Sequence, residues 1–466
     1  MNIPLTIISQ ASSCCAPTPE ATTSCCGPVE SKQKETPSKE IPFQLNKTYP
    51  VAIIGAGPVG LAAAAHLSLA GEAFIVLEKG ADVAENIKSW QHVRLFSPWQ
   101  YNIDKAAKQL LLKSGWMMPE EDVLPTGQEL REAYLQPLAN LPEIKPFVSF
   151  NTTVTGISKK NHDKMKSARR EDAPFVIYTE QNGETKRILA SAVIDATGTW
   201  ATPNPVHADN VWISAERKLA DKIFYGIPNV DLLKERYTGK RIAVIGGGHS
   251  AINTILELGK LDNVDLTWIL RKKRVEDAYG GEEKDALAAR GELGSRIHTL
   301  VDEGKVKVFT PFYIEELAQT TADIIIKGEG INGEQQLPAV DEIIVNTGSR
   351  PDFSFLQEIR LSIDAAVESV EALAPLIDPN EHSCGTVRPH GELELRQPET
   401  GFYIVGMKSY GRAPTFLMAT GYEQVRSVVA YLTGDLEAAR KVELDLPETG
   451  VCSVDLSSSN TQTTCC

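Results

Sequence analysis

The sequence of 466 residues predicts an α/β protein with two Rossmann-like dinucleotide-binding domains, the second inserted into the first, between two disordered tails. Three observations support this prediction. Two glycine fingerprints each follow an apolar run and open a helix-like stretch. Two further apolar runs end in Thr-Gly, within 192–198 and 342–348, where the chain would leave and re-enter the first domain. Both ends of the chain are polar and carry cysteines, without a periodic apolar pattern.

The first fingerprint runs from Gly55 to Gly60 and follows the buried parallel strand expected at 51–54. In a turn of this kind the first glycine makes the tight bend, and the second lets the backbone approach a pyrophosphate. The third lets the helix pack close to the sheet, with the phosphates at the helix N-terminus. The positions expected to hold the first nucleotide are Gly55, Gly57, Pro58, Val59 and Gly60.

The next predicted strand, 73–77, ends in Glu78 and Lys79. A carboxylate roughly 20 residues beyond the fingerprint accepts hydrogen bonds from ribose hydroxyls. We therefore expect Glu78 to bind the ribose of the first nucleotide, with Lys79 beside it.

The second fingerprint, from Gly246 to Ala251, has the same spacing as the first, with Ala251 in the place of the third glycine. The strand that follows, 264–270, ends in the four cations of 271–274 instead of a carboxylate. Cations pair with a 2′-phosphate, whereas a carboxylate repels it. The second domain is therefore predicted to bind NADPH in preference to NADH. The expected positions are Gly246, Gly248, His249, Ser250, Arg271 and Lys272.

The rest of the predicted domains consists of the two strands that end in Thr-Gly and of a later strand with its helix. The strand 401–406 precedes a loop and a helix that begins near 419. The strand ends expected to contribute to nucleotide binding are Ala196, Thr197, Gly198, Thr347 and Gly348. The predicted boundaries are 1–46 for the first tail, 47–212 and 342–445 for the two parts of the first domain, 213–341 for the inserted domain, and 446–466 for the second tail.

Composition and charge exclude several classes of protein. The net charge of −14 argues against nucleic acid or an anionic membrane as a partner. No apolar run approaches the ~20 residues of a membrane span, and the N-terminus lacks the pattern of a secretory signal, so we expect a cytoplasmic protein. Homodimerisation is compatible with this composition.

Six of the eight cysteines form vicinal pairs, and seven of the eight lie in the tails. Vicinal disulfides are geometrically awkward, CxxC spacing for zinc is absent, and a disulfide framework is unusual in the cytoplasm. A flexible dithiol instead suits a thiophilic ion such as trivalent arsenic or mercury. Incidental cysteines in a degenerate tail are the alternative. The expected ligands are Cys14, Cys15, Cys25, Cys26, Cys452, Cys465 and Cys466.

The order of these motifs over about 48–435 resembles the flavoproteins with two dinucleotide-binding domains, which include thioredoxin-reductase-like enzymes and flavin-containing monooxygenases. The resemblance implies FAD in the first domain and NADPH in the inserted one. It also implies that Val154 (through its backbone, to adenine) and Gly406 contact FAD. The helix near 419 could then direct its N-terminus at the flavin pyrimidine edge.

The chain has no cysteine between Cys26 and Cys384, whereas disulfide reductases of this superfamily need a redox pair beside the flavin. Molecular oxygen is therefore the expected electron acceptor. The monooxygenase pattern FxGxxxHxxx[FY] is half present, because Phe224 and Gly226 match it but Val230 occupies the histidine position. With its cysteine pairs, the chain resembles the flavin-dependent monooxygenases of bacterial arsenic-resistance operons, which implies a trivalent, often methylated, arsenical as substrate.

Two further regions could shape the site. Trp90 and Arg94 follow the FAD unit and could wall the flavin, although such aromatic residues are more often core. In the polar segment 379–391, Cys384 is the expected catalytic residue, with His382 and His390 beside it, unless these are ordinary loop residues. The alternatives to the monooxygenase are a mercuric or disulfide-type flavin reductase, a flavin N-hydroxylase of an amine, and a metal chaperone without flavin.

Overall fold

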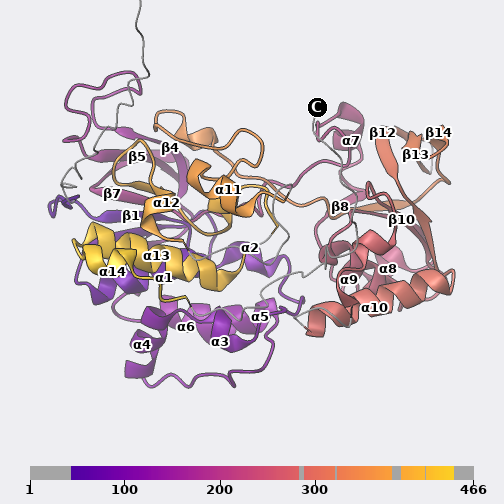
Figure 1. Cartoon of the computed structure of the whole chain (residues 1–466), viewed down its shortest axis with the longest axis horizontal. Helices are drawn as coiled ribbons and strands as arrows, with labels where there is room; N and C mark the ends of the chain where they lie inside the picture. Colours follow the sequence, from indigo (N-terminus) through magenta and orange to yellow (C-terminus); the bar gives the residue numbers. More distant parts are fainter. Residues whose placement is uncertain (1–42, 283–287, 321–322, 380–389, 415, 445–466) are drawn as a thin grey trace, which may run out of the picture. The chain divides into compact units, whose positions relative to one another are not determined.

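The computed structural model describes residues 43–282, 288–320, 323–379, 390–414 and 416–444 (Figure 1). The α/β fold expected from the sequence is confirmed, because two parallel sheets each carry one of the glycine fingerprints. None of the helices in these ranges is long and apolar enough to cross a bilayer.

The first sheet has five parallel strands and carries the first fingerprint. Across the sheet their order is β16 (Phe402–Ile404), β7 (Ala192–Asp195), β1 (Val51–Ile54), β2 (Phe74–Leu77) and β3 (Val148–Ser149). Helix α1 (Pro58–Leu69) starts with proline at its first turn, and its buried alanines 62–65 let it lie close to α13 (Met418–Leu432) (Figure 1). The carboxyl ends of β1, β2, β7 and β16 therefore meet near the start of α1.

The second sheet also has five parallel strands and carries the second fingerprint. Their order is β11 (Val306–Phe309), β10 (Asp265–Ile269), β9 (Arg241–Ile245), β15 (Glu342–Val345) and β8 (Ile223–Tyr225). Helices α9 (His249–Leu258) and α10 (Ala288–Asp302) pack against each other beside it. The indole of Trp268 is fully buried in the core that α9 shares with this sheet.

The prediction that the strand within 342–348 begins the return to the first domain is wrong. This strand is β15, and it pairs in parallel with β9 on one side and β8 on the other. Ile343, Ile344 and Val345 are buried there, so the apolar strand is an inner strand of the second sheet. The return to the first sheet begins after Val345.

Two small antiparallel sheets accompany the large ones. One consists of β4 (Thr153–Lys159), β5 (Phe175–Gln181) and β6 (Glu184–Ala190), and the other of β12 (Phe312–Gln319), β13 (Ile324–Gly330) and β14 (Gly333–Gln336). The remaining short helices are α2 (Glu85–Lys88), α3 (Trp99–Asn102), α4 (Lys105–Lys113), α5 (Gly127–Glu129), α6 (Gln136–Ala139), α7 (Ser214–Lys218), α8 (Lys234–Tyr237), α11 (Ala374–Ile377), α12 (Glu392–Leu395) and α14 (Leu436–Arg440).

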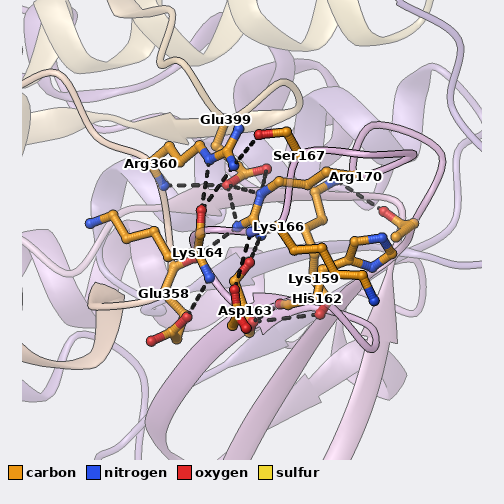
Figure 2. A network of polar contacts seen from close by, with 12 residues as sticks. Lys159, His162, Asp163, Lys164, Lys166, Ser167, Arg170, Glu358, Arg360 and Glu399 are labelled. Atoms are coloured by element: carbon orange, nitrogen blue, oxygen red, sulfur yellow. Dashed lines mark hydrogen bonds and ion pairs between the residues drawn. The ribbon is translucent and has the colours of Figure 1, made fainter.

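The loop between β4 and β5 is anchored by a buried ion pair (Figure 2). Arg170 donates to both carboxylate oxygens of Glu399, with the shortest nitrogen–oxygen distance at 2.7 Å. The same guanidinium donates to the backbone carbonyls of Asp163 and Glu358. The Arg170 side chain thus binds three segments of the chain, at Asp163, Glu358 and Glu399. These bonds hold the loop against the residues that precede β16.

The two chain crossings between the sheets are hydrogen-bonded to each other. The backbone N–H of Asn204 donates to the carbonyl of Gly348 at 3.0 Å, and that of Arg350 donates to the carbonyl of Thr202 at 3.0 Å. The hydroxyl oxygens of Thr199 and Ser349 lie 2.9 Å apart. The outgoing and returning segments therefore form one paired connection.

Candidate dinucleotide-binding sites

The turn between β1 and α1 has the shape that the first fingerprint predicts. Gly55 has φ +99°, and a Cβ placed on it would lie 3.0 Å from the carbonyl oxygen of Ala196. A Cβ on Gly60 would lie 2.0 Å from the carbonyl oxygen of Gly55, so the helix and the turn are in direct contact. A Cβ on Gly57, in contrast, would meet nothing within 4 Å. The turn is closed on its protein side and open at the position where a pyrophosphate would approach.

The carboxylate of Glu78 lies across this turn. Its two oxygens accept hydrogen bonds from the backbone N–H groups of Ala56 and Gly80, each at 2.7 Å. The side chain is half-buried at the end of β2, where the sequence places a ribose-binding carboxylate. Its position beside the open glycine fits a nucleotide whose phosphates lie at α1 and whose ribose lies at Glu78.

The other residues expected at the first nucleotide lie around the same turn. The carbonyl of Ala196, with Thr197 and Gly198 following it, borders Gly55 at the end of β7. A Cβ on Gly406 would lie 3.3 Å from the side chain of Val59. Val154, in β4, lies two residues beyond Thr152, whose N–H donates to the carbonyl of Glu78 at 2.8 Å. The strand ends thus bring most of the expected FAD positions to one place.

The second fingerprint forms a turn of the same kind between β9 and α9. Gly246 has φ +132°, and a Cβ on it would lie 2.3 Å from the carbonyl oxygen of Asn346. A Cβ on Gly248 would meet nothing within 4 Å. This turn opens into a cavity of 740 Å³. All six residues expected at NADPH line the cavity: Gly246, Gly248, His249, Ser250, Arg271 and Lys272. Thr347 and Gly348, which were expected at the return to the first domain, line it as well.

The end of β10 gives this cavity a positive wall. Arg271 and Lys272 both line it, and both are exposed. Arg271 donates to the backbone carbonyl of Ala208 at 3.3 Å, and Lys272 donates to that of Asp277 at 2.5 Å. Neither of these hydrogen bonds neutralises a cation, because carbonyl oxygens carry no net charge, so both charges remain available to a phosphate group.

Two buried carboxamides supply an independent indication that the cavity binds a polar ligand. The Oδ1 atoms of Asn204 and Asn346 are buried, and neither has a hydrogen-bond partner among the described residues. Their Nδ2 groups are satisfied by the backbone carbonyls of Thr347 and Gly226. A buried acceptor without a donor is costly, and ribose hydroxyls or the nicotinamide carboxamide are donors of the required kind. The residues present therefore fit NADP(H).

Tyr225 adds a fixed hydroxyl to the wall of this cavity. It donates to a carboxylate oxygen of Glu216 at 2.6 Å. Burial, together with the neighbouring Glu216 carboxylate, raises the pKa of Tyr225 well above its usual value. The phenol therefore stays protonated at neutral pH, and its hydrogen bond to Glu216 keeps this part of the cavity wall in one arrangement.

Some expected site residues lie elsewhere or outside the described ranges. The ring of Trp90 packs against Trp200 at 6.1 Å, and Arg94 lines a separate cavity of 610 Å³, so their role beside FAD stays a prediction. His390 is buried beside Gln424. The cysteines and His382 lie outside the described residues: Cys14, Cys15, Cys25, Cys26, His382, Cys384, Cys452, Cys465 and Cys466.

Three polar residues near these two sites were not predicted as site residues. Asn346 directly follows β15, and a polar residue at the carboxyl end of a parallel strand is a recognisable signal of a ligand site. Asn204 has no such local signal, because only its pairing with 347–348 brings it to the cavity. Lys408 also has none, since its partner Asp195 is 213 residues away.

Two open glycine turns on parallel sheets, one beside a carboxylate and one beside cations, define an oxidoreductase that uses two dinucleotides. The family model described as pyridine nucleotide-disulphide oxidoreductase matches residues 52–384, and the chain belongs to this family.

Known proteins agree with this assignment. Ferredoxin–NADP reductase 1 of Shouchella clausii is 23% identical over 379 residues, which cover 80% of this chain and 90% of that protein. The bacillithiol disulfide reductase Bdr of Bacillus cereus has the same fold, with a TM-score of 0.62, 18% identity, and coverage of 84% of this chain and 99% of that one. The FAD-bound cadaverine monooxygenase DfoA of Erwinia amylovora gives a TM-score of 0.57, 14% identity, and coverage of 90% and 99%. The protein is a flavin-dependent oxidoreductase, and its cofactors are FAD and NADP(H).

Proposed function

We propose that the protein is an NADPH- and FAD-dependent monooxygenase that oxidises trivalent arsenicals, in particular methylated or other organic ones, to their pentavalent forms. One observation carries the proposal: the chain has no cysteine between Cys26 and Cys384, yet six of its eight cysteines form vicinal pairs. The folded core thus offers no internal dithiol to take electrons from the flavin over that span. The terminal dithiols suit a soft trivalent ion.

The charges at the two strand ends support the cofactor arrangement. In the first site, Glu78 would accept hydrogen bonds from the ribose of FAD, while the open turn at Gly57 admits the pyrophosphate. In the second, Arg271 and Lys272 would pair with the 2′-phosphate of NADPH. The carboxamide oxygens of Asn204 and Asn346 would accept hydrogen bonds from the same ligand. Bound FAD would supply the redox chemistry, which is acceptance of a hydride from NADPH and delivery of electrons to oxygen.

The reaction balances without a catalytic base. A methylarsenic(III) dihydroxide, NADPH, a proton and dioxygen give a methylarsenic(V) acid, NADP⁺ and water. Arsenic loses two electrons and gains one oxygen atom through its lone pair, and the second oxygen atom leaves as water. The protein's contribution is to position both ligands and to exclude water from the cavity that contains Trp200 and Met407 beside the NADPH residues.

Oxygen uptake with NADPH and a panel of arsenicals tests the proposal. We expect methylated arsenic(III) to raise oxygen uptake, with one arsenic(V) formed for each NADPH oxidised. A variant with Ser at Cys14, Cys15, Cys25 and Cys26 should raise the apparent KM for the arsenical more than it lowers kcat, because only capture is lost. The matched change of Cys465 and Cys466 should act in the same direction but more weakly, and Cys384→Ser should lower kcat.

The relatives favour a second candidate, a reductase that passes electrons to an external acceptor. Ferredoxin–NADP reductase and bacillithiol disulfide reductase are named for ferredoxin and for a disulfide. The lack of an internal cysteine pair between 26 and 384 is compatible with this route too. Rapid NADPH oxidation without oxygen, in the presence of ferredoxin, a low-molecular-weight disulfide or mercury(II), would favour it. Arsenical-independent hydroxylation of an amine would favour a flavin N-hydroxylase, and DfoA is named as a monooxygenase of the amine cadaverine.

A further inference from the structure

A fully buried ion pair joins the end of β7 to the turn that follows β16, near the first nucleotide turn. The Nζ atom of Lys408 lies 2.7 Å from a carboxylate oxygen of Asp195, and both side chains are 0% exposed. Lys408 also donates to the hydroxyl of Thr197 at 3.2 Å. The rings of Phe353 and Phe355 cover the ammonium group, at 5.3 and 4.5 Å from their centroids. The pair is thus sealed from water.

The second carboxylate oxygen of Asp195 fixes the turn that follows β7. It accepts hydrogen bonds from the backbone N–H of Thr197 at 3.1 Å and from the hydroxyl of Thr197 at 2.7 Å. One oxygen therefore holds the turn 196–198, while the other holds Lys408. Through this carboxylate, the positions of the two turns depend on each other.

The turn that contains Lys408 is fixed from its other side by helix α13. The side-chain carbonyl of Gln424 accepts from the N–H of Gly406 at 2.7 Å, and its amide donates to the hydroxyl of Ser409 at 2.9 Å. Ser409 in turn donates to the carbonyl of Gly406 at 2.7 Å. The 3₁₀ turn Gly406–Tyr410 is therefore held in one conformation by polar groups on both sides.

Both turns border the open glycine turn of the first site. The carbonyl oxygen of Ala196 lies 3.0 Å from the position of a Cβ on Gly55, and Gly406 packs on Val59. A buried ion pair is a costly way to fill a core, since two apolar side chains of similar volume often give equal or greater stability. The cost is offset where the pair fixes a geometry that apolar side chains cannot specify.

We propose that Asp195 and Lys408 are positioning residues for FAD. They hold the turns 196–198 and 406–410 at the spacing and orientation that the flavin nucleotide requires, through directed hydrogen bonds to Thr197. This inference concerns how FAD is held and is independent of which substrate the enzyme oxidises.

The chain contains a matched control. Arg170 and Glu399 form another buried ion pair, with side chains 2% and 4% exposed and a shortest distance of 2.7 Å. That pair holds the loop between β4 and β5 through the backbone carbonyls of Asp163 and Glu358 (Figure 2). It resembles Asp195–Lys408 in charge and burial but fixes a different part of the first domain.

The experiment compares two paired apolar variants of the full chain, Asp195→Leu/Lys408→Met and Arg170→Met/Glu399→Leu. The apoproteins are prepared by removing FAD, and two quantities are measured: the melting temperature of each apoprotein, and the Kd for FAD from the quenching of flavin fluorescence. We expect both paired variants to fold, because each removes both charges of its pair together. We expect the Kd for FAD to rise at least 10-fold in Asp195→Leu/Lys408→Met and to stay within 2-fold in the control.

Wild-type FAD affinity in Asp195→Leu/Lys408→Met would overturn the proposal, because apolar packing would then suffice. Equal weakening in the control would also overturn it, because the effect would then follow general stability. Thr197→Val tests the same geometry without touching either charge. It removes the hydroxyl that Asp195 and Lys408 bind but keeps the shape of the side chain, and it should raise the Kd for FAD about 3-fold. An unchanged Kd in Thr197→Val would contradict the role given to Thr197.

Discussion

The two glycine turns share a backbone but differ in charge and in packing. Gly55 and Gly246 both have positive φ, and the second glycine of each turn faces open space. Glu78 directly follows the strand beside the first turn, whereas Arg271 and Lys272 lie just beyond the strand beside the second. The shared backbone serves what the two nucleotides have in common, their pyrophosphate. The residues after the strands match one difference between the two nucleotides, the 2′ position of the adenosine ribose, which carries a hydroxyl in FAD and a phosphate in NADPH.

The third position of each fingerprint shows a second difference. Gly60 has no room for a methyl group, because a Cβ would lie 2.0 Å from the carbonyl oxygen of Gly55. Ala251 occupies the matching position of the second turn and is fully buried. Helix α1 therefore contacts its turn through the backbone of Gly60, whereas α9 has the methyl group of Ala251 at the matching position. The first site tolerates less change than the second.

The largest effect is expected from Gly60→Ala. The new methyl group must push α1 away from Gly55, and overpacking of this kind costs about 1–3 kcal/mol or more. The purified protein should be colourless, with a melting temperature several degrees lower. Ala251→Gly is the matched change in the second turn, and it should keep its flavin and a KM for NADPH within about 2-fold. A yellow, stable Gly60→Ala protein would contradict the packing difference.

Gly57→Ala should have the next largest effect. It puts a methyl group into the open space of the first turn without a clash in the protein itself. The apoprotein should keep its stability, while the Kd for FAD rises by about 100-fold or more, because the methyl group occupies the approach of the pyrophosphate. Gly248→Ala should leave FAD bound and raise the KM for NADPH instead. Normal FAD content in Gly57→Ala would refute the assignment of the first turn.

Arg271→Ala addresses the charge difference between the two sites. A charge-assisted hydrogen bond to the 2′-phosphate is worth roughly 1.5–3 kcal/mol, so the KM for NADPH should rise by about 10-fold or more. The KM for NADH should change little, since NADH has no 2′-phosphate. Steady-state kinetics with both nucleotides check this, and an equal loss with both would show that Arg271 is structural.

The smallest effect is expected at the start of the second sheet. Hydrogen bonding to Arg241 lowers the pKa of Asp341 to about 2, against an ordinary value of 3.8. The carboxylate thus stabilises the folded state above pH 3.8, and this contribution is lost as the pH falls from 3.8 toward 2. Asp341→Asn should lower the melting temperature by a few degrees at pH 6 and hardly at all near pH 2. A difference that persists at pH 2 would exclude this pair as its cause.

Local patterns allowed the sequence to predict the two turns, the charged residues after the neighbouring strands and the apolar strands that flank the turns. A glycine turn needs only neighbours along the chain, so Gly55 and Gly246 were recognisable in isolation. The position of β15 was not predictable, because an apolar strand can be an inner strand of either sheet and only its partners β8 and β9 decide. Asn204 and Lys408 were missed for the same reason, since the partners of both lie far away in the sequence.

The paired crossing between the sheets brings the two ends of the second nucleotide-binding unit together. The chain leaves at Thr199 and comes back at Ser349, and the hydroxyl oxygens of these residues are only 2.9 Å apart. A segment cut out between them has its two new ends side by side, which is the geometry that tolerates domain insertion and circular permutation. A short Gly-Ser bridge from Thr199 to Ser349 would leave the flavin unit as a continuous polypeptide. The same two junctions would allow the nicotinamide unit to be replaced by one that has a carboxylate in place of Arg271. Such an exchange would change the preferred electron donor from NADPH to NADH and leave the residues of the first glycine turn unchanged.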